Sequence, residues 1–76
     1  MNSTEAVKAA LEKYKKLKLV SNINPSRLII SWNTYELLQN ASEEEKRGLL
    51  TIRTFCDIPL CVDPNIVDDF FYFSME

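Results

Sequence analysis

The sequence predicts an α+β domain in which helices cover one face of a small sheet of about three strands. Three observations predict this class. An apolar stripe at helical spacing lies near the N-terminus, two short apolar runs lie further along, and four consecutive aromatic residues lie near the C-terminus. With 76 residues the chain is expected to be one domain, 1–76. The expected order of elements is α-β-α-α-β-β.

Residues 3–19 are expected to form the first helix. Apolar residues recur there at the i, i+3, i+4, i+7 spacing of one helix face, namely Val7, Ala10, Leu11, Tyr14 and Leu17. One of the polar residues from Asn2 to Thr4 can cap this helix, and Glu5 suits the positive end of its dipole. The pair Asn24-Pro25 then interrupts regular structure.

Residues 27–31, with the sequence RLIIS, predict a strand buried on both faces, because its apolar residues do not alternate with polar ones. A second helix is expected from about Asn33, capped by Asn33 or Thr34. A third helix is expected to begin at Ser42, because Ser42 and Glu45 form a capping-box pair. It is expected to continue to about Thr54 through Leu49, Leu50, Ile52 and Arg53. Gly48 would lie inside this third helix at a cost of about 1 kcal/mol, which predicts a close packing contact or a bend there.

The segment DIPLCVDPNIVDDFFYFSM, residues 57–75, predicts two strands joined by a turn. IPLCV forms the first strand, DPNIVDD the connection and FFYFSM the second strand, since acids and prolines are typical of turns and aromatics of strands. Alternation along the second strand places Phe70 and Tyr72 on one face and Phe71 and Phe73 on the other. One pair fills the core. The other pair is either covered by a helix or exposed, and the sequence leaves both outcomes open.

The composition argues against an enzyme and against a metal or cofactor site. The chain has no histidine, which removes the commonest general base and metal ligand, and its one glycine argues against a phosphate-binding loop. Cys56 and Cys61 are too few for a structural zinc site, and we expect two reduced thiols, although a disulfide is possible if they flank a hairpin loop. Aspartates are the right ligands for a hard cation, but their spacing fits no calcium loop. We therefore expect solvated turn residues at Asp57, Asp63, Asp68 and Asp69.

No secretory signal or membrane-spanning run is visible in the sequence. The expectation is a soluble, intracellular protein of the cytoplasm with no membrane partner.

Charge is distributed unevenly along the chain. Residues 1–27 hold six of the nine basic residues and two of the eleven acids, a net charge of +4, and residues 28–76 carry a net charge of −6. Lysines on the first helix can dock phosphate groups, so a nucleic-acid-binding regulator that uses Lys13, Lys15, Lys16 and Lys18 is one hypothesis. The overall charge of −2 favours a solvated helix face instead.

The leading hypothesis is stoichiometric binding to a protein partner or to a second copy in a homodimer. Exposed aromatics beside an open strand edge form a good protein-binding surface. The expected apolar anchors are Phe71, Phe73 and Trp32, with Asp68 and Asp69 as rim charges. Acids in residues 43–69 also fit a decoy for a basic groove, because charge complementarity speeds association.

The stretch IPLCVDPNIVDDFFYF resembles a pattern met in small phage and prophage proteins. There, an I-P-[apolar]-x-V-D-P strand leads through an acidic turn into an aromatic or apolar strand. The resemblance covers about a fifth of the chain, and Asp57 stands where such patterns often have a glycine. It implies a small binding protein of a phage or mobile element, either an inhibitor of host machinery or a minor assembly protein in the host cytoplasm. It implies no catalytic residue.

Overall fold

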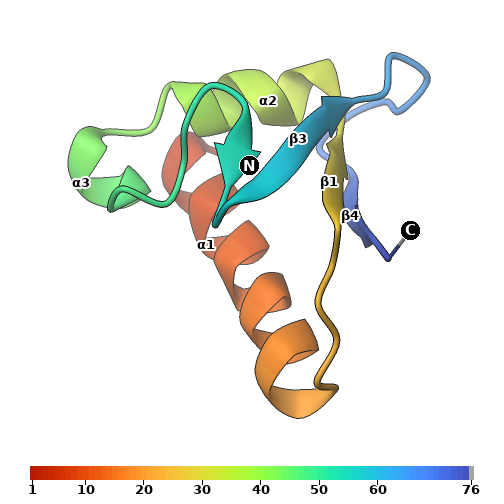
Figure 1. Cartoon of the computed structure of the whole chain (residues 1–76). Helices are drawn as coiled ribbons and strands as arrows, with labels where there is room; N and C mark the ends of the chain where they lie inside the picture. Colours follow the sequence, from red (N-terminus) through yellow and green to blue (C-terminus); the bar gives the residue numbers. More distant parts are fainter. Residues whose placement is uncertain (76) are drawn as a thin grey trace.

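The computed structural model describes residues 1–75 as an α+β domain with a four-stranded mixed sheet. Figure 1 shows α1 and α2 on the same side of the sheet. None of the helices in the described part of the chain is long and apolar enough to cross a membrane. The elements are α1 (Ser3–Lys15) with a π-helical turn η1 (Lys16–Val20), β1 (Arg27–Ile30), α2 (Trp32–Gln39), α3 (Glu43–Lys46), β2 (Thr54–Phe55), β3 (Ile58–Val62) and β4 (Phe71–Ser74).

The strands lie in the order β2-β3-β1-β4. β1 runs parallel to β3 and antiparallel to β4, and β2 pairs with β3 in an antiparallel hairpin. β3 and β4, the two strands expected to be joined by a turn, do not pair with each other, because β1 lies between them. The connection from Val62 to Phe71 is long enough to cross the end of β1, and the highly apolar β1 takes a central place with both edges paired.

The helix starts follow local capping, and the helix ends differ from the prediction. Asn2 caps α1, and its side-chain oxygen accepts from the Glu5 N–H at 2.8 Å. α2 begins earlier than expected, because Ser31 is its cap and its Oγ accepts from the Thr34 N–H at 3.0 Å. The predicted capping box of Ser42 and Glu45 opens α3.

The third helix does not continue to Thr54, as we expected, but ends at Lys46. Arg47 and Gly48 have left-handed backbone conformations, with φ of 51° and 71°, which close the helix. A Cβ atom at Gly48 would meet nothing within 4 Å, so the glycine supplies a backbone conformation and no packing space. Shortening α3 frees the following residues to form β2, which was not predicted.

The hydrophobic core fills the space between the helices and the inner face of the sheet. Leu28 and Ile30 are fully buried, and the strand register places them beside Phe73 and Phe71 of β4 respectively. Each such buried side chain contributes about 1.5–3 kcal/mol relative to exposure. The other buried apolar residues are Ala6, Val7, Ala10, Leu38, Ala41, Leu50, Phe55 and Ile58.

Candidate functional site

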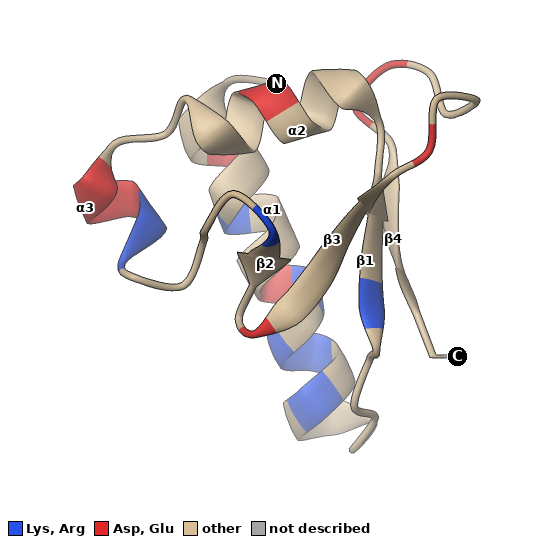
Figure 2. Ribbon diagram, turned by 45° about the horizontal axis from the view of Figure 1, so that its top comes forward, with Lys and Arg blue, Asp and Glu red and all other residues tan. Residues whose placement is uncertain are grey.

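The outer face of the sheet carries apolar side chains that no helix within residues 1–75 covers. The register aligns Ile29 with Cys61 of β3 and with Tyr72 of β4, and alternation directs all three away from the buried residues Leu28 and Ile30. Tyr72 is 40% exposed, while Ile29 and Cys61 are half-buried. In Figure 2, α1 passes behind β2 and lies to the left of β1 and β4, and no described helix lies in front of these strands. An apolar side of the sheet is therefore accessible.

β4 is also an edge strand, and its backbone has unused hydrogen-bonding groups. The Asp63 N–H donates to the Ile30 carbonyl at 2.9 Å, so the peptide groups of Ile30 face β3. Successive residues of a strand direct their N–H and C=O groups to opposite sides. The N–H and C=O groups of Ile29 therefore face β4 and pair with Tyr72. Phe71 and Phe73 therefore direct their N–H and C=O groups to the free side, where no described residue bonds them.

β4 is only four residues long, but its edge lacks two other common protections against pairing. Natural edge strands are blunted by charges, proline, bulges or short length. The sequence of β4, FYFS, contains neither a charge nor a proline. The other edge strand, β2, is only two residues long, and an isolated bridge between Leu50 and Phe55 covers its outer side. β4 is thus the more open edge of the sheet.

The loop that precedes β4 is tied to the start of α2. The Ser31 hydroxyl donates to the carbonyl of Asp68 at 2.6 Å, and Asn33 donates a side-chain hydrogen bond to the Asp69 carboxylate. The amino group of Met1 lies 3.5 Å from the same carboxylate. Asp69, one of the two expected rim charges, therefore has partners within the chain. Asp68 is exposed, and its left-handed φ of 60° turns the chain into β4.

Phe71 and Phe73 are not the exposed anchors that we expected. Phe73 is only 8% exposed, and its ring centroid lies 6.1 Å from that of Tyr14 in the core. Phe71 is half-buried under Lys13, whose Nζ lies 5.3 Å from the ring centroid. Both rings face the helices because their register partners on β1 do so. The prediction that Phe71 and Phe73 share one face of the strand is correct. The side chains of the four aromatics that point outward are those of Phe70 and Tyr72.

Phe70 and Tyr72 are those outward aromatics. Phe70 is 59% exposed, and its ring centroid lies 5.9 Å from that of Tyr72. We use the name "β4 edge surface" for these two outward rings together with the free backbone groups of Phe71 and Phe73. The surface combines apolar side chains with hydrogen-bonding capacity along one strand.

Trp32, the third expected anchor, is exposed, with 58% of its surface accessible. Its ring stacks edge-on against Tyr35 at 6.1 Å, and the Tyr35 hydroxyl donates to the Ile52 carbonyl at 3.0 Å. Trp32 therefore belongs to a second aromatic pair on α2, separate from the pair formed by Phe70 and Tyr72.

The lysines of the first helix lie in different surroundings. Lys13 contacts the Phe71 ring, and the Nζ of Lys18 lies 5.5 Å from the ring centroid of Tyr14. Lys15 lines a groove of about 430 Å³ between α1 and α3, while Lys16 is exposed. The other residues that line this groove are Thr4, Val7, Lys8, Leu11, Glu12, Glu45 and Arg47. Acids and apolar groups thus interrupt the positive charge.

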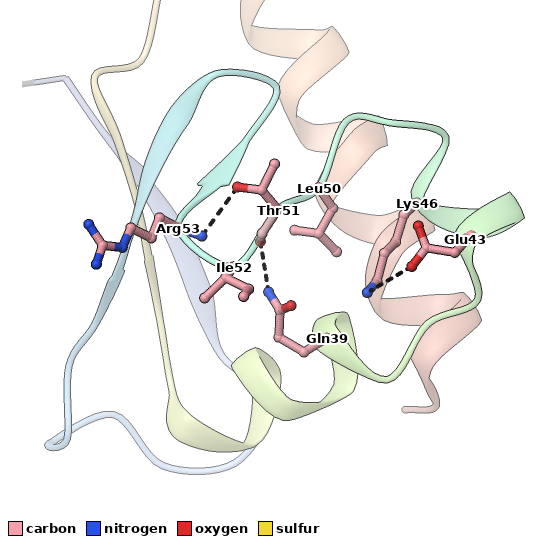
Figure 3. A pocket seen from close by; sticks show the side chains of 7 residues that line it. All are labelled: Gln39, Glu43, Lys46, Leu50, Thr51, Ile52 and Arg53. Atoms are coloured by element: carbon pink, nitrogen blue, oxygen red, sulfur yellow. Dashed lines mark hydrogen bonds and ion pairs between the residues drawn. The ribbon is translucent and has the colours of Figure 1, made fainter.

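A second hollow of about 590 Å³ lies between α2, α3 and the loop that leads to β2 (Figure 3). Gln39 donates to the Thr51 carbonyl at 2.9 Å, and the Arg53 N–H donates to the Thr51 hydroxyl at 3.2 Å. Lys46 and Glu43 form an ion pair at 3.9 Å. The polar groups that line the hollow are thus partners of one another.

Both cysteines are free and half-buried. Cys56 and Asp57 are the two central residues of the β2–β3 turn, with φ of 53° and 66°. Burial raises the pKa of the Cys56 thiol, the Asp57 charge adds to this, and Lys18 opposes it. Within residues 1–75, no three His, Cys, Asp or Glu side chains gather in a way that could hold a metal ion.

Comparison of the chain with protein-family models, with curated proteins and with solved structures gave no match.

Proposed function

We propose that this protein is a non-enzymatic interaction domain that binds a protein partner by strand addition at the β4 edge surface. The observation that carries the proposal is the free edge, where Phe71 and Phe73 offer backbone groups beside the exposed rings of Phe70 and Tyr72. In strand addition, main-chain hydrogen bonds supply affinity and alternate side chains supply specificity. Aromatic rings are also the side chains that most often dominate binding energy at protein interfaces.

The alternative function, nucleic-acid binding through Lys13, Lys15, Lys16 and Lys18, has less support. Two of these lysines lie against aromatic rings of their own chain, and Glu12 and Glu45 line the groove beside Lys15. Phosphate contacts make affinity fall steeply as salt rises, whereas an edge of hydrogen bonds and apolar rings is much less sensitive to salt. Salt dependence therefore separates the two functions.

The test is capture of partners from a lysate of the source cells by the tagged protein, with and without nuclease. The double variant Phe70→Lys/Tyr72→Lys charges the β4 edge surface. The matched control, Leu19→Lys/Val20→Lys, charges two residues that are 81% and 79% exposed elsewhere. We expect a stoichiometric protein partner that survives nuclease and high salt, is retained by the control and is lost by the double variant. A partner that disappears with nuclease, or that the double variant retains, would contradict the proposal.

A further inference from the structure

Resting on the proposed function, we infer that the strand that binds the β4 edge surface is β4 of a second copy of this chain. The two β4 strands would lie antiparallel about a two-fold axis through Tyr72, which joins two sheets into one. Closed two-fold pairs are the commonest form of self-association, because one surface then serves both partners.

The backbone of β4 fits this axis. A two-fold axis through Tyr72 places Phe71 of one copy opposite Phe73 of the other, and these are the residues whose N–H and C=O groups face the free edge. Each of the two such pairs exchanges two hydrogen bonds, so four form in all. An axis between two residues would instead set inward side chains of one copy opposite outward side chains of the other. The axis through Tyr72 uses both free residues of β4 and keeps the faces aligned.

The side chains of the outer face are also self-complementary about this axis. Tyr72 meets Tyr72 of the second copy in a non-hydrogen-bonded pair, the geometry in which opposite side chains lie closest. The exposed ring of Phe70 comes opposite the small Ser74 of the second copy. Arg27 is the register partner of Ser74 on β1, so its exposed guanidinium can reach across Ser74 toward that ring.

The side chains on the inner face of the sheet also favour β4 of a second copy as the strand that binds. Phe71 is half-buried in the single chain, and the axis through Tyr72 brings Phe73 of the second copy beside it. No residue of β4 is charged, so two copies meet at this strand without like charges in opposition. Each copy therefore places its Phe70 ring opposite Ser74 of the other copy and within reach of the Arg27 side chain there. An unrelated strand would need a small residue and a cation at the same positions.

The experiment is sedimentation velocity of the full chain from about 1 µM to about 1 mM, at low and high salt, because a small interface predicts weak association. Tyr72→Lys sets two cations opposite each other and is expected to weaken the dimer by at least about tenfold. Tyr72→Phe should dimerise as the wild type does. The matched control is Ile52→Lys, which replaces a 72% exposed apolar residue away from β4 and should also dimerise normally.

Circular dichroism checks the fold of each variant. If Tyr72→Lys fails to fold, Phe70→Lys replaces it, since Phe70 precedes β4 and is more exposed. A chain that stays monomeric over the whole concentration range overturns the inference, and so does a folded lysine variant that dimerises like the wild type. If the chain is monomeric but its lysine variant no longer captures a partner that the wild type captures, only the inferred self-pairing is overturned. The proposed function then stands.

Discussion

Replacement of Gly48 by alanine separates two interpretations of residues 42–54 by the sign of the stability change. If the third helix continued to Thr54, as Leu49, Leu50 and Ile52 predict, Gly48→Ala would stabilise the protein by about 1 kcal/mol, because alanine is the better helix former. In the structure α3 ends at Lys46, and Gly48 has a left-handed φ of 71°. The substitution should therefore destabilise the protein.

The expected magnitude follows from two opposing terms. A residue with a Cβ in the left-handed region costs about 1–2 kcal/mol. Alanine also restricts the unfolded chain, which offsets about 0.4–1 kcal/mol of that cost. No steric term is added, because a Cβ at this position meets nothing within 4 Å. The net loss is about 1 kcal/mol, which corresponds to a fall in melting temperature of about 4–8 °C for a domain of this size.

The assay is urea and thermal unfolding of the wild type and Gly48→Ala, followed by far-ultraviolet circular dichroism. Gly48→Asn is the matched control, because asparagine tolerates the left-handed region better than alanine and should lose less stability. A Gly48→Ala variant that is more stable than the wild type would refute the left-handed conformation and support a longer helix.

Three further predictions follow from other parts of the chain. Hydrogen bonds, first that from the Thr4 hydroxyl, lower the pKa of Glu45. Glu45→Gln should therefore be less stable than the wild type near neutrality, with the difference disappearing as the pH falls through the lowered pKa in an acid-unfolding series. In a variant that lacks Cys61, Cys56 should react with iodoacetamide more slowly than a cysteine peptide at pH 8, because burial and the Asp57 charge raise the pKa of its thiol. Asp57→Asn should speed this reaction. Leu38→Ala removes a fully buried side chain and should cost about 2–5 kcal/mol in urea unfolding, whereas Leu19→Ala, at an 81% exposed position, should cost less than about 0.5 kcal/mol.

The elements with a clear local signal could be predicted from the sequence. The apolar stripe of the first helix, the apolar run of β1 and the IPLCV stretch of β3 each correspond to an element of the structure. The capping box at Ser42 also marks a helix start correctly. Each of these signals depends on neighbouring residues alone, so no knowledge of the tertiary structure was needed.

The errors arise where the outcome depends on distant contacts. β2 has two residues, too few to show a period, and Gly48 is compatible with both a helix and a left-handed helix end. Strands that are neighbours in sequence favour a hairpin, but β1 takes the place between β3 and β4. Alternation separated Phe71 and Phe73 from Phe70 and Tyr72, while only the register with β1 shows which pair faces the core. The expected anchors Phe71 and Phe73 therefore required an outward face, whereas the register turns both of them toward the helices.

The most direct test of the β4 edge surface is amide hydrogen exchange of Phe71, Tyr72 and Phe73, measured by NMR in dilute and concentrated solution. We expect the Tyr72 amide to be protected in both, because it pairs with Ile29 of β1. The amides of Phe71 and Phe73 should exchange fast in dilute solution and become protected together as concentration rises and a second strand adds. Protection of Phe71 and Phe73 in dilute solution would contradict a free edge. Fast exchange of both at concentrations where the chain is associated would place the interface elsewhere.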